Sequence, residues 1–391
     1  MMQNYIYLRA YLNDNLGDDL FIHIIGDRYP QQIFKVFDIN KSKAEKFPSN
    51  IEFLLEEVDI DKFEYDRVRF EKIRNKRILN HLIVDCFLPE NRQKRKILKK
   101  AKLKIYVIGS GFMEGGKIGI EYYLNEKSFF KNNSYLIGSN FGPYKTVRYK
   151  EIHKKLFSMA KDICFRDSYS EKEFEMLPNV RQEADIVFSY KNGEQEISNL
   201  PLGYILISVV NLNKDNEENT IINEKYITFL VNLTKKYIEI GKKVYFVGFC
   251  KNQKDDIIID KVIAKLLTRD KKNIQVFNYP NTTYKEIMWL FKNADGIVAS
   301  RYHAAIIGML YQKNLYILSY SDKINHVLYD IDKEIKYINI TEGININPEI
   351  YMKNYGYTIS SERLNELKKS AERQFLKLDA ELLNKESKVE E

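Results

Sequence analysis

The sequence predicts an α/β fold made of two Rossmann-like, doubly wound domains that face a cleft. Two observations support this prediction. The chain has 391 residues, which is too long for one ordinary hydrophobic core. Short apolar runs of β-branched and aromatic residues recur, and each is followed by a turn and then by an amphipathic stretch, as in parallel βαβ units.

The predicted strands follow one another along the whole chain. In the first half they cover residues 4–11, 32–38, 80–87, 104–112, 134–142, 162–167 and 184–190. In the second half they cover 204–211, 242–250, 274–280, 296–301 and 314–320, with helical stretches near 221–240, 255–268, 283–293 and 303–313. The polar stretch 191–203 is typical of a linker. We therefore expect domains at 1–195 and 196–391, the second ending in an amphipathic helix from Ser360 to about Leu383.

The charge balance limits the classes of ligand. Lys and Arg together number 62 against 54 Asp and Glu, and the two signs are interspersed. This basic excess suits an anionic ligand or a membrane surface, but it falls short of a nucleic-acid-binding signature. The densest basic run, residues 91–104, has two interpretations: a solvated helix face, or a contact with lipid headgroups or a lipid-linked substrate.

Cysteine usage and hydropathy point to the cytoplasm. Only three cysteines occur, and their spacing suggests neither a zinc site nor a disulfide framework. The N-terminus lacks a basic region followed by a long apolar run, and no stretch of about 18 apolar residues occurs. We therefore expect a cytoplasmic protein, either soluble or bound peripherally at the inner face of the plasma membrane.

The candidate site residues directly follow the strands, because ligands of doubly wound sheets bind outside the carboxyl ends of the strands. After the first strand the chain turns through Asn15, Gly17 and Asp18 and enters an apolar-periodic helix. Gly17 suits a tight turn or the close approach of a ligand. Asp18 has two interpretations, a helix cap or a catalytic base that faces the cleft.

Three further loops of the first half carry glycine or polar residues. Gly109 and Gly111 let backbone N–H groups approach an anionic or hydroxylated ligand, although their spacing lacks the full dinucleotide-binding pattern. Asn140 either forms part of a turn or offers a donor and an acceptor to sugar hydroxyls. Arg166, beside Asp167, either forms a salt bridge within the fold or binds a carboxylate or phosphate through its planar fork.

A fifth constellation lies in the second half. The strand near residue 299 ends at Ser300 and a helix begins, so Arg301 and His303 fall in the first turn, where free backbone N–H groups and the helix dipole favour an anion. Lys323 follows the next strand, which places it at the carboxyl edge of the adjacent strand. A lone His or Lys is more often structural or a surface charge, but their joint placement at one sheet edge favours a functional role.

These motifs, in this order, resemble the polysaccharide pyruvyl transferases, which attach ketal-linked pyruvate to sugars of capsules, exopolysaccharides and secondary cell-wall polymers. The resemblance covers nearly the whole chain and is carried by the stretches NLGDD, GSGF, GSNFGP, FRDSYS, ADIVFS, SRYHAAIIGM and SYSDK. The sequence departs from the usual pattern at Tyr302, where members more often have Leu or Phe, and in a first loop that is poorer in glycine. The resemblance implies a two-lobed, glycosyltransferase-B-like architecture with phosphoenolpyruvate as donor substrate and no cofactor.

The resemblance also implies roles for single residues. Phosphoenolpyruvate carries a phosphate and a carboxylate, for which Arg301, Lys323 and Arg166 are the candidate cations. His303 would protonate the methylene carbon of the donor, and Asp18, reaching from the other lobe, would accept the proton of the attacking sugar hydroxyl. The remaining substrate-binding candidates are Ser300, Asn15, Gly17, Gly109, Gly111 and Asn140.

The expected partners follow from the same resemblance. The first domain is expected on the side of the sugar acceptor, and the second on the side of phosphoenolpyruvate. The acceptor would be a sugar, either free or carried on a polyprenyl diphosphate. No metal-ligand cluster is visible in the sequence, and no nucleic-acid partner is expected.

Two other functions compete with pyruvyl transfer. A nucleotide-sugar glycosyltransferase of the same architecture would place a diphosphate in the basic pocket of the second lobe, and fold alone does not separate the two. The helix start with Lys323, and the lack of an obvious second-lobe carboxylate for a ribose, favour pyruvyl transfer. A non-catalytic carbohydrate-binding or scaffolding protein would not need His303.

Overall fold

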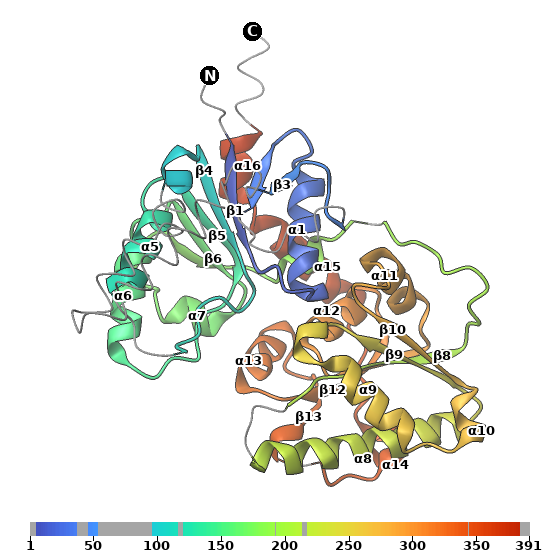
Figure 1. Cartoon of the computed structure of the whole chain (residues 1–391). Coiled ribbons are helices and arrows are strands. Elements are labelled where there is room, and N and C mark those ends of the chain that lie inside the picture. The colour runs from blue at the N-terminus through green and yellow to red at the C-terminus, as the bar shows by residue number, and fades with distance from the viewer. Residues whose placement is uncertain are drawn as a thin grey trace, which may run out of the picture. The chain divides into compact units, whose positions relative to one another are not determined.

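A computed structural model of the chain describes residues 5–36, 46–53, 96–115, 120–191, 193–212, 217–342 and 344–383. The chain, coloured from its N-terminus to its C-terminus in Figure 1, divides into two compact units. Unit 1 comprises Met1–Tyr11, Phe21–Ile186 and Glu372–Glu391, and unit 2 comprises Leu12–Leu20 and Val187–Ala371. The predicted strand at 80–87 and residues 91–95 of the basic run lie outside the described residues.

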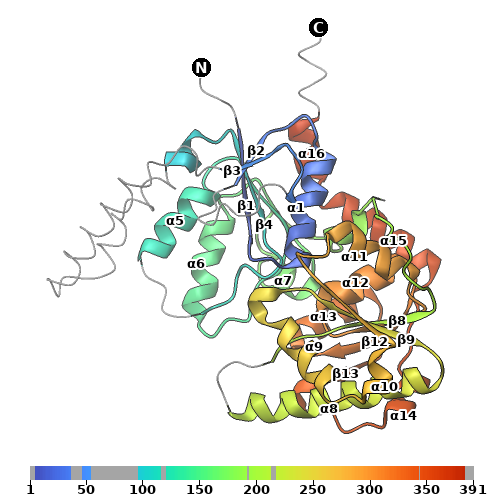
Figure 2. The same cartoon turned by 45° about the vertical axis from the view of Figure 1, so that its right-hand side comes forward.

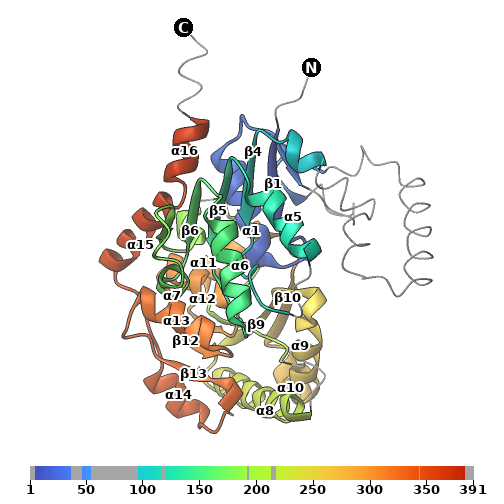
Figure 3. The ribbon, with the colours of Figure 1, turned by 90° about the vertical axis from the view of Figure 1, so that its left-hand side faces the viewer.

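The sheet of unit 1 has seven parallel strands in the order β3-β2-β1-β4-β5-β6-β7. Its strands are β1 (Ile6–Ala10), β2 (Phe34–Val36), β3 (Ile51–Phe53), β4 (Leu103–Val107), β5 (Ser134–Ser139), β6 (Asp162–Phe165) and β7 (Val180–Gln182). The helices connecting them include α1 (Leu16–Arg28), α5 (Ile120–Phe130), α6 (Val147–Phe157) and α7 (Ser168–Lys172). Figure 3 shows α5 and α6 together over one face of this sheet, where an aromatic core fills the space beneath them.

The sheet of unit 2 has six parallel strands in the order β10-β9-β8-β11-β12-β13. These are β8 (Tyr204–Ser208), β9 (Lys243–Gly248), β10 (Ile274–Asn278), β11 (Gly296–Ala299), β12 (Asn314–Ser319) and β13 (Tyr337–Asn339). The helices are α8 (Glu217–Glu239), α9 (Asp255–Ala264), α10 (Thr268–Lys271), α11 (Tyr284–Asn293), α12 (Tyr302–Leu310), α13 (Asp322–Ile331), α14 (Pro348–Asn354) and α15 (Ser361–Arg373). In Figure 2, α8 and α14 lie on one side of the sheet, and α11 and α12 on the other.

The two parallel sheets confirm the predicted α/β class. The strand predicted at 184–190 is wrong, because the last strand of unit 1 is Val180–Gln182 and residues Ile186–Ser189 form one turn of 3-10 helix. Ile186, Val187 and Phe188 are nevertheless fully buried, and a short buried apolar run does not reveal from its sequence which conformation buries it.

The C-terminal segment does not form one continuous helix. The helix α15 ends at Arg373, a turn follows at Gln374, and the chain continues as the helix α16 (Leu376–Leu382). The buried Gln374 amide accepts a hydrogen bond from Gly138 N (3.0 Å) and donates to the carbonyl oxygens of Phe165 (3.2 Å) and Ala184 (3.1 Å). These bonds explain why residues from Glu372 onward group with unit 1, whereas the predicted boundary kept them in the second domain.

Asp379 adds a second anchor for this segment. Its carboxylate pairs with Arg28 and accepts a hydrogen bond from the hydroxyl of Tyr29 (2.6 Å). Arg28 also pairs with Glu372, which precedes the break in the helix. The predicted amphipathic helix therefore packs in two pieces, and its last turns complete unit 1.

One buried histidine of unit 1 makes the stability of the fold depend on pH. His153 donates from Nδ1 to the Tyr149 carbonyl (2.8 Å), which leaves Nε2 to accept from the Tyr122 hydroxyl (2.8 Å). Burial lowers the pKa of His153 to about 4, against an opposing effect of the Tyr149 carbonyl. The folded protein therefore favours the neutral ring.

We predict that His153 destabilises the fold in acid. In the unfolded chain the ring titrates near pH 6.5. The free energy of unfolding therefore keeps its full value above that pH and falls by roughly 3 kcal/mol as the pH drops to about 4. Chemical denaturation at a series of pH values tests this. His153→Gln keeps a donor and an acceptor without the charge, and it should show a weaker loss of stability between pH 7 and 5 than the wild type. Equal slopes would contradict the assignment.

Candidate active site

The candidate site of unit 2 lies where the strand order reverses, between β8 and β11. The register pairs Ala299 with Ser208, so the two strands end side by side. Ser208 Oγ accepts a hydrogen bond from Ser300 N (3.0 Å), and Ser300 Oγ accepts one from the hydroxyl of Tyr226 (2.7 Å). In doubly wound folds this reversal point is the usual place for a ligand.

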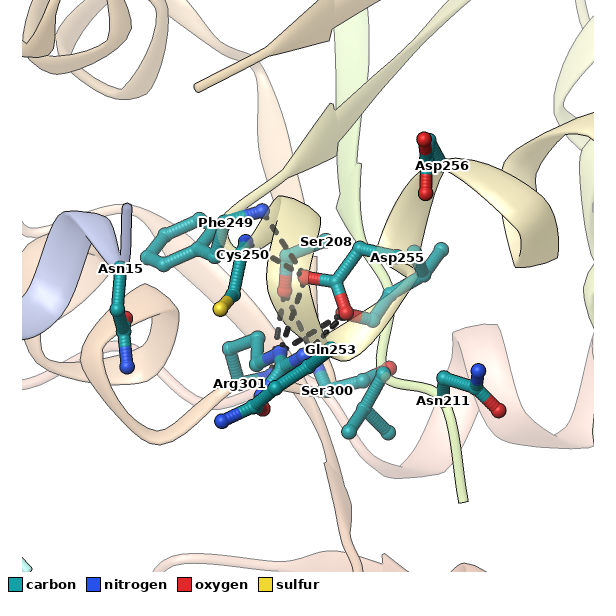
Figure 4. Close-up of polar contacts among 12 residues, drawn as sticks. Asn15, Ser208, Asn211, Phe249, Cys250, Gln253, Asp255, Asp256, Ser300 and Arg301 are labelled. Carbon is teal, nitrogen blue, oxygen red and sulfur yellow. Dashed lines mark hydrogen bonds and ion pairs between the residues drawn. The ribbon is translucent and has the colours of Figure 1, made fainter. Parts of the chain in front are cut away.

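Arg301 follows Ser300 and stands at the N-terminus of α12 without a capping bond from its side chain, which instead forms a buried ion pair with Asp255 (Figure 4). Its Nε donates to Asp255 Oδ2 (3.1 Å), Nη2 donates to Oδ1, and Nη1 donates to the side-chain oxygen of Gln253. Arg301 is 8% exposed and Asp255 1%. Burial alone would lower the pKa of Arg301, but the Asp255 carboxylate outweighs this effect and raises the pKa, so the guanidinium stays charged.

Sequence reasoning missed Asp255. The stretch after β9 was expected to begin a helix near residue 255, and its carboxylate gave no sign of a partner 46 positions away in the sequence. Asp255 also qualifies the expectation that the second lobe has no carboxylate for a ribose. A carboxylate is present beside the site, but Arg301 and the backbone N–H groups of Phe249 (3.0 Å) and Cys250 (3.1 Å) already engage it.

The segment Leu12–Leu20 belongs to unit 2 by its contacts, although it joins β1 to α1. Leu16 N donates to Phe249 O (3.0 Å), and Asn15 forms an antiparallel bridge with Cys250. The hydroxyl of Tyr279, after β10, donates to Asp19 Oδ2 (2.5 Å). The predicted boundary would have placed Asp18 in the first domain, whereas these bonds group it with His303 in the second.

Gly17 and His303 are in direct contact. A β-carbon at Gly17 would lie 1.8 Å from Nδ1 of His303 and 2.6 Å from its Cγ, so only glycine leaves room for this ring. Beside it, Asn15 donates from Nδ2 to Asp18 Oδ2 (2.7 Å), and its Oδ1 accepts from Gly17 N (3.2 Å). Asp18 is 8% exposed and His303 is half-buried. The turn that carries the candidate base therefore packs on the candidate acid.

Lys323 lies in the first turn of α13, after β12. The parallel pairing of β11 with β12 confirms that this turn follows the strand next to β11. Tyr320, in the same loop, is close enough to Arg301 to affect its pKa. The side chain of Lys323 is half-buried.

A second group of predicted residues lies at the strand ends of unit 1. Asn140 N donates to Gly109 O (3.1 Å), which brings the loops after β4 and β5 together. Arg166 follows β6 and donates from Nη1 to Asp185 Oδ2 (2.9 Å), while a β-carbon at Gly109 would lie 3.0 Å from that nitrogen. Asn140 is 1% exposed, and within the described residues its Oδ1 has no hydrogen-bond partner. Such a buried acceptor suits a ligand hydroxyl.

Gly111 has a different environment from the other residues of this group. A β-carbon there would lie 2.1 Å from the hydroxyl oxygen of Tyr106, whose ring stacks on Phe112 at 4.7 Å in the aromatic core. Asp167, the neighbour of Arg166 in sequence, caps α7 by accepting from Ser170 N (2.8 Å). Packing against Tyr106 therefore explains why position 111 is a glycine.

The predicted site residues fall into two groups, one in each unit. Unit 2 holds Asn15, Gly17, Asp18, Ser300, Arg301, His303 and Lys323, and unit 1 holds Gly109, Gly111, Asn140 and Arg166. In the part of the chain that the structure describes, no cluster of three or more His, Cys, Asp or Glu side chains could hold a metal ion. Over the same residues, no helix is long and apolar enough to cross a membrane.

Several solved structures share the fold of this chain at low sequence identity. HepE from Anabaena, in complex with UDP and glucose, is 10% identical with a TM-score of 0.51, and the match covers 98% of this chain and 100% of HepE. HepE in complex with UDP alone is 9% identical with a TM-score of 0.52, and the match covers 99% of this chain and 100% of HepE. The glycosyltransferase of kitacinnamycin is 10% identical with a TM-score of 0.50, and the match covers 95% of each chain. These similarities confirm the glycosyltransferase-B-like fold.

Sequence comparison identifies the family. The chain has no significant match among curated proteins. The family model described as "Polysaccharide pyruvyl transferase" matches residues 15–322, which include both the turn at 15–18 and the turn at 300–303. The match spans most of the chain, and the chain therefore belongs to the polysaccharide pyruvyl transferase family.

Proposed function

We propose that this protein transfers pyruvate from phosphoenolpyruvate to two hydroxyl groups of one sugar in a bacterial surface polysaccharide or its lipid-linked precursor. The product is a cyclic ketal, and inorganic phosphate leaves. The observation that carries this proposal is the contact of His303 with Gly17 beside the hydrogen-bonded pair of Asn15 and Asp18. This contact supports the proposal because it brings the candidate acid next to the turn that carries the candidate base.

The chemistry assigns a step to each of these groups. His303 donates a proton to the methylene carbon of phosphoenolpyruvate, which becomes a methyl group and leaves a cationic centre on the adjacent carbon. The first sugar hydroxyl forms a C–O bond to that carbon, and Asp18 accepts its proton. The second hydroxyl forms the other C–O bond as the bond to phosphate breaks, and its proton leaves with the phosphate. No oxidant or reductant is consumed.

The charges suggest how unit 2 would bind the donor. Asp255 neutralises Arg301, so we assign the attraction for the anionic donor to Lys323 and to the dipole of α12, whose N-terminus lies at Arg301. Arg301 then contributes directed hydrogen bonds more than net charge. In unit 1, Asn140 Oδ1 would accept a hydrogen bond from a sugar hydroxyl, and the Arg166 fork would contact the anionic or hydroxylated part of a substrate.

A nucleotide-sugar glycosyltransferase is the second candidate, since HepE was solved with UDP. Two observations weigh against it. The described residues directly after β8, 209–212, contain no glycine, whereas a phosphate-binding loop after the first strand of such a sheet is rich in glycine. Asp255, the carboxylate beside the site, is engaged by Arg301 and two backbone N–H groups instead of being open to a ribose.

We further propose that the protein acts in the cytoplasm, at the inner face of the plasma membrane when its acceptor is linked to a polyprenyl diphosphate. The basic run 91–104 supports this, because clustered Lys and Arg attract anionic headgroups. Its first five residues lie outside the described part of the chain. Unchanged binding to anionic vesicles after the run is neutralised would remove this support.

Replacing the candidate acid should abolish turnover. Phosphate release from phosphoenolpyruvate is measured with a panel of galactose-, glucose- and N-acetylmannosamine-containing acceptors. His303→Ala should lower kcat by roughly 10²- to 10⁴-fold, the usual contribution of a general acid, and Asp18→Asn should act in the same direction. His326→Ala, an exposed histidine of α13, is the control and should retain activity. Full activity of His303→Ala would exclude it as the acid.

A side chain at Gly17 should displace His303 without unfolding the protein. Gly17→Ala places a methyl group on the imidazole, so kcat/KM should fall by about 100-fold, as expected when a reacting group moves by about 1 Å. The control is Gly115→Ala, where an added β-carbon meets no atom within 4 Å. Wild-type kinetics in Gly17→Ala would show that His303 does not need this position.

Ligand-induced stabilisation separates the two candidate functions. At about 100 times its Kd, a ligand adds about 2.7 kcal/mol to the free energy of unfolding, so phosphoenolpyruvate should raise the Tm clearly while UDP-sugars do not. Lys323→Met should reduce the shift. A Tm raised by nucleotide sugars and not by phosphoenolpyruvate would favour the glycosyltransferase.

A further inference from the structure

Asp255 gathers four hydrogen bonds from two different parts of unit 2. Its Oδ2 accepts from Phe249 N (3.0 Å), Cys250 N (3.1 Å) and Arg301 Nε (3.1 Å), and its Oδ1 accepts from Arg301 Nη2. Figure 4 shows these bonds converging on one carboxylate, with Asp256 turned away from them. Each carboxylate oxygen therefore has at least one directed partner.

The two sets of donors, the backbone N–H groups at 249–250 and the Arg301 guanidinium, each belong to a segment next to a candidate catalytic residue. Phe249 and Cys250 pair with Leu16 and Asn15, which belong to the turn carrying Asp18. On the other side, Arg301 lies two residues before His303 and joins the turn from β11 into α12. The Asp255 carboxylate thus connects the support of the candidate base to the support of the candidate acid.

We propose that Asp255 is a positioning residue, which fixes the turn at 15–18 and the turn at 301–303 in one arrangement. The catalytic part of this inference rests on the proposed pyruvyl transfer. Asp255 is 1% exposed and its oxygens are engaged, so it acts through these two turns and not on the substrate itself. A carboxylate is needed because neither Asn nor Ala offers two acceptor oxygens to a guanidinium.

The chain offers a closely matched control for this inference. Asp255 and Asp256 are neighbours in the first turn of α9, so Asn at either position removes one negative charge from the same helix end. Among the described residues, the Asp256 carboxylate accepts a hydrogen bond only from the adjacent Ile257 N (3.0 Å), and it makes none to Arg301. Any difference between Asp255→Asn and Asp256→Asn therefore reports on the bonds of Asp255.

The kinetic test compares these two variants in phosphate release from phosphoenolpyruvate. Asp255→Asn should lower kcat by roughly 10- to 100-fold, because a small displacement of the reacting groups has effects of this size. KM for phosphoenolpyruvate should not rise by more than about threefold, since Arg301 keeps its charge and loses only the carboxylate that neutralised it. Asp256→Asn should match the wild type. A residue with a purely structural role would not separate kcat from KM in this way.

Two buried cysteines report on the same substitution independently of activity. Cys250 is 1% exposed, beside the Asn13 carbonyl in unit 2, and Cys164 is fully buried in unit 1. Burial raises the pKa of both thiols, so labelling of the native protein by N-ethylmaleimide should be slow. In Asp255→Asn the label should reach Cys250 faster while Cys164 stays protected, as mass spectrometry of the peptides would show.

The outcomes separate this inference from the proposed function. Equal kcat and equal Cys250 labelling in the two Asn variants would overturn it, and so would simultaneous labelling of both cysteines, which indicates general unfolding. A wild-type protein that releases no phosphate would overturn the proposed function, and the Cys250 labelling alone would then decide whether Asp255 holds the turn. If Asp255→Asn does not fold, Asp255→Glu against Asp256→Glu applies the same criteria with the charge retained.

Discussion

The pairing of Asn15 and Leu16 with Phe249 and Cys250 is the contact on which the candidate site depends. It fastens the segment between β1 and α1 to the end of β9, and it thereby sets Gly17 against the imidazole of His303. The segment packs this closely because position 17 has no side chain. The proposed acid and base consequently belong to one contact unit, although they lie far apart in the sequence.

A second constraint is that both arginines predicted to bind the substrate form buried ion pairs within the fold. Arg301 pairs with Asp255 and Arg166 with Asp185, and the side chains of these four residues are less than one tenth exposed. A buried guanidinium without a partner would strongly destabilise the fold, and the paired carboxylate offsets this cost for each arginine. The pairs also remove most of the net charge. We therefore assign the attraction for an anionic donor to other groups, and we expect the Arg301–Asp255 pair to orient the neighbouring turns.

Much of this arrangement could be predicted from the sequence. Strands were recognisable as short apolar runs, and residues placed after them, such as His303 and Asn140, lie at the strand ends in the structure. The partners of these residues were not predictable, because Asp255 and Asp185 look like ordinary polar positions and their pairing depends on tertiary contacts. The grouping of Asp18 with unit 2 and of Gln374 with unit 1 was missed for the same reason: each depends on hydrogen bonds to distant backbone atoms.

In the proposed reaction the methylene carbon of phosphoenolpyruvate is protonated to a methyl group, and the adjacent carbon becomes the ketal carbon that carries two sugar oxygens. The most direct test is mass spectrometry of the acceptor after incubation with phosphoenolpyruvate and enzyme in D₂O. We expect an acceptor that carries one pyruvate ketal with one deuterium in its methyl group, since the proton added to the methylene carbon comes from an exchangeable acid. An acceptor left unmodified by phosphoenolpyruvate but extended by a hexose from a nucleotide sugar would contradict it.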